Sequence, residues 1–150
     1  MAAVPELVGP KSAYRVHWHV LITHFPISFF VAAFGFQILH LFTSPECFEK
    51  ATNVALIAGT VVLMPTTGSG WRTWKTRYQG ARVLLFQRKI MIAFIMQGLS
   101  IVLAIWRVSS MSNFEDAPAN TAHWAYLAGN TLLMAGASAE GYYGGRLNHR

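Results

Sequence analysis

The side chains in this sequence that could do chemistry are few, and most are histidines within long apolar runs. His24 stands near the start of the first run and Glu140 near the end of the last. A histidine beside a glutamate can hold a proton and pass it on. Two further residues, Trp71 and Arg88, fall at the same expected depth. The four together predict a polar cluster that suits a quinone headgroup, whose two carbonyls accept protons on reduction.

The same region also allows a purely structural interpretation. A carboxylate near a membrane boundary needs a cation, and the cations nearest in depth to Glu140 are Arg88 and Lys89. Such an ion pair would fasten two helices together and would need no cofactor. The quinone site and the ion pair therefore stand as alternatives.

A second pair of histidines points to metal chemistry. His40 lies near the end of the first apolar run and His123 at the start of the fourth, so antiparallel runs would place both at the same membrane face. Two histidines on facing helices of a bundle can ligate the iron of a b-type haem. His40 and His123 are therefore candidate haem ligands. Gln37, one turn before His40, would orient that ring or bond to a neighbouring helix.

Catalytic templates of soluble enzymes are missing from the sequence. It contains no serine in a nucleophile-elbow motif and no phosphate-binding loop. The neighbouring His17 and His19 lack a carboxylate partner for a hydrolytic metal site. The single cysteine, Cys47, cannot form an internal disulfide. We therefore assign no catalytic residue, and we expect no catalytic activity of the chain on its own.

The candidate residues need helices that cross a membrane to position them. The chain has 150 residues, of which 53% are hydrophobic and 12% charged, and soluble domains carry about twice that share of charge. A soluble bundle is disfavoured because its helices would carry polar faces. Each of four apolar runs reaches the ~20 residues that a spanning helix needs; they cover about residues 20–42, 54–74, 88–109 and 123–145. The fourth is the least apolar.

We therefore predict an all-α integral membrane protein, an up-down-up-down four-helix bundle. Residues 1–19 would form an N-terminal cytoplasmic or interfacial arm, residues 20–147 the bundle, and residues 148–150 a cytoplasmic tail. Short loops make consecutive helices antiparallel, and small residues favour close helix contacts in lipid. Several small residues mark the fourth helix for such packing: Gly129, Gly136, Ala137 and Gly141.

The basic residues give the orientation in the membrane. The net charge is +6, and ten of the twelve Lys and Arg residues lie before the first run, after the fourth, or in the segment from the end of the second run to the start of the third. Basic loops stay on the cytoplasmic side, so both termini are predicted to be cytoplasmic, in the inner membrane of a bacterium or archaeon. The charge then needs no nucleic acid to explain it. The partners predicted are the lipid bilayer and other subunits of a membrane complex.

Three short motifs resemble a known family. His24-Phe25-Pro26-Ile27 opens the first run, Thr-Gly-Ser-Gly-Trp at 67–71 closes the second with a glycine-containing break, and Gly144-Gly145 ends the fourth. Over about residues 16–147 the chain is similar to the predicted-membrane-protein family named domain of unknown function 2231. The resemblance implies a four-span bundle, sometimes suspected of haem or redox association, and it supplies no activity.

Two positions depart from the common pattern of that family. Many members carry an acidic residue where this chain has Trp71, and many carry a histidine near the segment that here reads Gln87, Arg88 and Lys89. If those groups form a site with the first-span histidine in the family, the chemistry of that site is altered or lost in this chain.

The sequence thus predicts a small integral membrane subunit of a larger complex, respiratory or redox in type. Four spans leave little chain for a soluble catalytic domain, so the subunit would anchor partners and bind quinone or b-type haem for electron transfer. The first alternative is a cofactor-free structural or lipid-binding subunit. The second is a transporter of small solutes or ions, ranked last because four spans without an inverted repeat are few for alternating access.

Overall fold

Four helices make up the described part of the chain. The structure is a computed structural model that describes residues 18–43, 46–77, 79–80, 84–110 and 121–148. The predicted all-α fold is confirmed: α1 spans Trp18–Thr43, α2 Glu46–Arg77, α3 Leu84–Ser109 and α4 Thr121–Asn148. Most of the predicted N-terminal arm, with His17, and the last two residues of the predicted tail lie outside the described residues.

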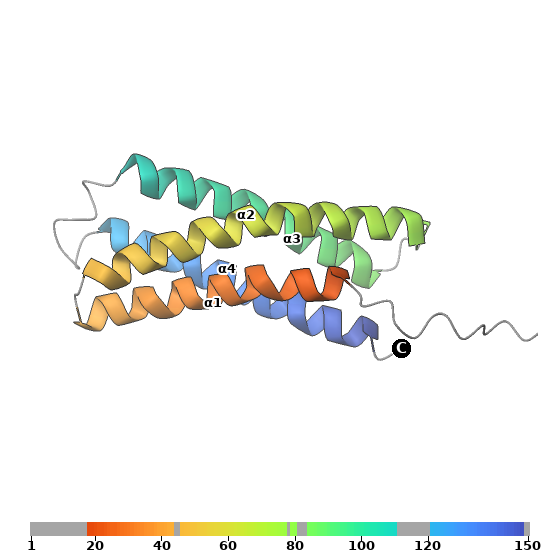
Figure 1. Cartoon of the computed structure of the whole chain (residues 1–150), viewed down its shortest axis with the longest axis horizontal. Coiled ribbons are helices and arrows are strands. Elements are labelled where there is room, and N and C mark those ends of the chain that lie inside the picture. Colours follow the sequence, from red (N-terminus) through yellow and green to blue (C-terminus); the bar gives the residue numbers. More distant parts are fainter. Residues whose placement is uncertain (1–17, 44–45, 78, 81–83, 111–120, 149–150) are drawn as a thin grey trace, which may run out of the picture.

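The helices form a bundle in which consecutive helices run in opposite directions (Figure 1). α1 packs on α2 and α4, and α3 packs on the same two neighbours. The end of α1, the start of α2, the end of α3 and the start of α4 therefore lie together, and we call this the His40 end. The opposite end, with the start of α1 and the end of α4, we call the Glu140 end.

The bundle is apolar both inside and outside. Its centre holds fully buried side chains such as Phe30, Leu56 and Leu133. Large apolar side chains also cover the outer surface; among them are Phe42, Val61, Ile95, Val102 and Leu132. Exposure of such a surface to water is unfavourable, whereas lipid tails solvate it. The exposed apolar residues therefore indicate a bilayer around the bundle.

Three of the four helices are long and apolar enough to cross a membrane. The qualifying segments are Ile22–Thr43 in α1, Glu46–Thr76 in α2 and Gln87–Ser109 in α3. α4 has 28 residues, about 42 Å at 1.5 Å per residue, so its length suffices. Its glycines, Asn130 and Glu140 lower its hydropathy, and its crossing of the membrane stays a prediction.

Close helix contacts form at two of the four small residues that the sequence marked for packing on the fourth helix. A Cβ atom on Gly129 would lie 2.7 Å from the Leu103 side chain, and one on Gly136 would lie 2.8 Å from the Met96 sulfur. α3 and α4 therefore meet at glycines seven residues apart. Ala137 is buried as expected, but a Cβ on Gly141 would meet nothing within 4 Å.

α2 continues without interruption through residues 66–70, so the break expected there is wrong. The hydroxyl of Thr66 donates to the Val62 carbonyl, and that of Ser69 to the Thr66 carbonyl, which keeps these polar residues bonded to their own helix. Glycine lowers helix stability by only about 1 kcal/mol, and packing in the bundle outweighs this. The helix ends at Arg77, after which Gly80, with φ of 69°, donates its N–H to the Trp74 carbonyl.

Candidate functional site

The two histidines predicted to share a site lie against each other at the His40 end. His40 is on the last turn of α1 and His123 on the first turn of α4. Their ring centroids are 5.6 Å apart with 31° between the ring planes, and the residues are only 7% and 2% exposed. Antiparallel packing of α1 and α4 brings these turns together, which is why depth alone could predict the pair.

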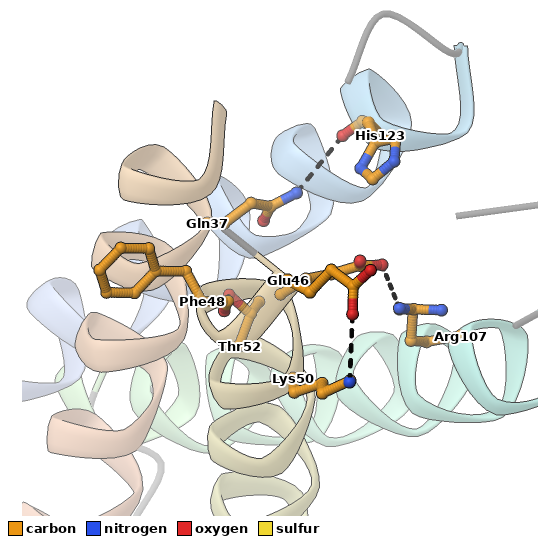
Figure 2. A network of polar contacts seen from close by, with 8 residues as sticks. Gln37, Glu46, Phe48, Lys50, Thr52, Arg107 and His123 are labelled. Atoms are coloured by element: carbon orange, nitrogen blue, oxygen red, sulfur yellow. Dashed lines mark hydrogen bonds and ion pairs between the residues drawn. The ribbon is translucent and has the colours of Figure 1, made fainter. Parts of the chain in front are cut away.

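A chain of amide hydrogen bonds fixes α1 against α4 beside the histidines. Gln37 Nε2 donates to the His123 carbonyl at 3.3 Å, and Asn130 Nδ2 donates to Gln37 Oε1 at 2.6 Å. Both amide residues are buried, at 3% and 1% exposure. Gln37 thus serves as the bond between helices that was one of its two predicted roles, and Figure 2 shows it reaching across to the first turn of α4.

A buried ion pair completes the polar end of the bundle. Arg107 Nη2, at the end of α3, donates to Glu49 Oε1, at the start of α2. Their side chains are 7% and 14% exposed. Tyr126 of α4 lies close to both charges and to Asn130, and its ring meets that of Trp106 edge-on at 6.4 Å. We call this set the His40 cluster; it comprises Gln37, His40, Glu49, Arg107, His123, Tyr126 and Asn130.

Sequence reasoning missed three members of this cluster. These are the Glu49–Arg107 ion pair and Tyr126. The signal for the pair was an acid and a base flanking two neighbouring apolar runs at the same expected membrane face. Because α2 begins at Glu46, two turns before its apolar run, Glu49 lies within the bundle and meets Arg107.

The four residues predicted to hold a quinone headgroup lie at the Glu140 end. Glu140 Oε2 is 3.8 Å from Lys89 Nζ, with both side chains mostly buried, so the ion pair between the third and fourth helices is present. Trp71 packs on Trp74 and, edge-on, on Phe94 at 5.8 Å. His24 and Arg88 are exposed. Among the described residues no hydrogen bond or ion pair joins Trp71 or Arg88 to Glu140.

The described residues include no group of three or more His, Cys, Asp or Glu side chains that could hold a metal ion. His40 and His123 alone provide two imidazoles at a separation that one ion could bridge. A haem needs more than its iron ligands, because its flat macrocycle must lie between them. The bonds of Gln37 to His123 and Asn130 close the α1–α4 gap next to the rings. A haem would have to open this bridge, so haem ligation stays a prediction.

One comparison with known proteins gives a match. The family model described as "Predicted membrane protein (DUF2231)" matches residues 16–150, which is nearly the whole chain and includes all four helices. No curated protein and no solved structure matches the chain.

Proposed function

Because the chain belongs to the DUF2231 family of predicted membrane proteins, we propose that it is a small integral membrane subunit of a larger redox complex of the respiratory type. In this proposal the chain anchors its partners in the bilayer, and the His40 cluster exchanges the protons that accompany electron transfer to or from quinone.

The observation that carries the proposal is the contact between His40 and His123. Ionisable side chains inside a membrane bundle are expensive and most often serve function. Imidazole is the side chain that accepts and releases protons near neutral pH, and two rings in contact can pass a proton from one helix to the other. The hydrogen bonds of Gln37 hold the turn that carries His123 in place, so the relative position of the two rings is fixed.

A b-type haem held by His40 and His123 is the alternative cofactor in this proposal. The pair supplies the two imidazole ligands, and the haem iron would supply one-electron chemistry between them. The test is an absorbance spectrum of the protein purified after haem-supplemented expression. A Soret band with reducible α and β bands that His123→Ala abolishes would support haem binding. A spectrum without these bands would exclude it.

A second candidate function, a cofactor-free structural or lipid-binding subunit, is favoured by the ion pairs. Glu49–Arg107 joins α2 to α3, and Lys89–Glu140 joins α3 to α4. Buried pairs of this kind fix the register of helices even where they add little stability. In this function the polar residues matter for assembly, and substitutions reduce the amount of complex rather than its turnover.

We further propose that the bundle lies in the inner membrane of a bacterium or archaeon with its Glu140 end on the cytoplasmic side. Among the side chains that the structure describes, four basic ones gather at this end: Arg72, Lys75, Arg88 and Lys89. Positive charge marks the cytoplasmic face. The same basic surface would meet anionic lipid headgroups and the other subunits.

The two functions are separated by measuring assembly and turnover in the same membranes. His123→Gln keeps a polar side chain of similar size but removes the imidazole. The redox proposal predicts normal amounts of complex and lost quinone-dependent electron transfer per complex. The structural proposal predicts less complex with normal turnover of what remains.

A further inference from the structure

Two half-buried residues, one on α2 and one on α3, have buried side-chain polar atoms without hydrogen-bond partners among the residues that the structure describes. They are Thr67, through Oγ1, and Gln97, through both Oε1 and Nε2. Buried polar atoms in proteins are nearly always satisfied by protein, water or ligand. Three unsatisfied atoms on facing helices therefore mark a place where another molecule completes the bonding.

The helix registers place Thr67 and Gln97 on the sides of α2 and α3 that face each other. Trp71 of α2 meets Phe94 of α3 edge-on. Thr67 is four residues before Trp71, and Gln97 is three residues after Phe94, so each shares the face of its neighbour. Because α2 and α3 run antiparallel (Figure 1), both steps lead in the same direction. Thr67 and Gln97 thus lie one helical turn from the Trp71–Phe94 contact, on the side toward the middle of the bundle along its length.

Aromatic side chains one turn from this polar pair reach the lipid-facing surface. Trp71 is 37% exposed and Phe94 52% exposed, so both rings are partly on the outside of the bundle. Met64 and Ile95, which flank them along the two helices, are also exposed. A flat molecule dissolved in the bilayer could therefore lie against the two rings and reach Thr67 and Gln97 one turn nearer the middle of the bundle.

We infer that Thr67, Gln97, Trp71 and Phe94 form a binding slot for a flat, carbonyl-bearing ring of the quinone class, entering from the bilayer. The Thr67 hydroxyl and the Gln97 Nε2 donate hydrogen bonds to a quinone carbonyl. Gln97 Oε1 accepts a hydrogen bond from the hydroxyl of the reduced form, so one amide serves both redox states. The ring lies against Trp71 and Phe94, which favour stacked or edge-on aromatic partners.

The inference rests on the proposed redox function for the identity of the ligand, but the slot is separate from the His40 cluster. It also differs from the cluster predicted from sequence, from which it keeps only Trp71. A single bridging water between Thr67 and Gln97 is the competing explanation of the unsatisfied atoms, and it predicts no affinity for quinone.

The test is a titration of the full chain in lipid nanodiscs with decylubiquinone, a short-chain quinone, read by quenching of tryptophan fluorescence. We expect saturable quenching by the wild type. Thr67→Val and Gln97→Leu should each raise the dissociation constant about tenfold, the effect of one hydrogen bond. Thr66→Val is the matched control, because the Thr66 hydroxyl is already bonded to the Val62 carbonyl, and it should bind as the wild type does.

Thermal unfolding of the same samples shows whether each variant is folded. Replacement of an unsatisfied amide by leucine should leave the melting temperature unchanged or higher. Wild-type affinity in Thr67→Val and Gln97→Leu, equal losses in all three variants, or no saturable quenching would overturn the slot. Failure here with a loss of turnover in His123→Gln would refute the slot alone, whereas decylubiquinone binding with normal turnover in His123→Gln would refute the proposed function alone.

Discussion

Arg107 on the last turn of α3 donates a hydrogen bond to the carboxylate of Glu49 on the first turn of α2, and the pair is buried within the bundle. Two charges removed from water are tolerable only when each compensates the other. The pair therefore ties the ends of two helices at the point where His40 and His123 also meet. Removal of this ion pair should destabilise the whole His40 cluster.

Glu49→Gln should destabilise the bundle by about 3–5 kcal/mol, because it leaves the Arg107 charge buried without its counter-charge. Denaturant unfolding in detergent micelles measures the change. The double variant Glu49→Leu/Arg107→Leu removes both charges and should recover most of the loss. A double variant as unstable as Glu49→Gln would show that the charge is not the cause.

The neighbouring ion pair on α2 provides the matched control. Glu46 accepts from Lys50 at 3.3 Å, but both side chains are more than three-quarters exposed. Exposed pairs contribute little because water screens them, so Glu46→Gln should leave the unfolding transition where it is. Equal effects at Glu46 and Glu49 would contradict the importance of burial.

The contact between α1 and α2 should be sensitive to one added methyl group. A Cβ on Gly59 would lie 2.9 Å from Phe30 Cε1 and 3.1 Å from Phe29 Cβ, so Gly59→Ala should cost about 1–3 kcal/mol through overpacking. A Cβ on Gly68 of the same helix meets nothing within 4 Å. Gly68→Ala should therefore stabilise α2 by about 0.5–1 kcal/mol. Thermal unfolding of the two variants compares them, and the reverse order would contradict the packing.

The single cysteine reports the orientation of the bundle. Cys47 is exposed on the first turn of α2, at the His40 end. In intact cells a membrane-impermeant maleimide should label it, because that end is proposed to face outward. Cys47→Ser/Gln87→Cys moves the thiol to an exposed position at the Glu140 end and should be labelled only after the cells are opened. Labelling of the second variant alone in intact cells would reverse the orientation.

The meeting of His40 and His123 followed from the sequence because it depends only on which turns share a membrane face. Lys89–Glu140 followed for the same reason. The Glu49–Arg107 pair did not, because the apolar run gave no sign that α2 begins as early as Glu46. Which of the predicted small residues make close contacts, Gly129 and Gly136 but not Gly141, depends on the rotation of α4 about its axis. That rotation is set by the packing of all four helices together. The sequence pattern of one helix does not determine it.

The binding slot between α2 and α3 could not be predicted from the sequence either. Thr67 belongs to the motif at 67–71 that was expected to break the second span, and nothing in the sequence connects it with Gln97. Only the Trp71–Phe94 contact sets the register between the two helices and shows that the polar residues face each other.

The most direct test compares two histidines on α1. His40→Gln and His24→Gln make the same change in one helix, at a buried position against His123 and at an exposed position. The measured quantity is quinone-dependent electron transfer in native membranes, per assembled chain. We expect His40→Gln to lower the rate about 100-fold, the usual contribution of a proton-transferring side chain, and His24→Gln to keep the wild-type rate. A normal rate in His40→Gln, or a loss confined to His24→Gln, would contradict the role of the His40 cluster.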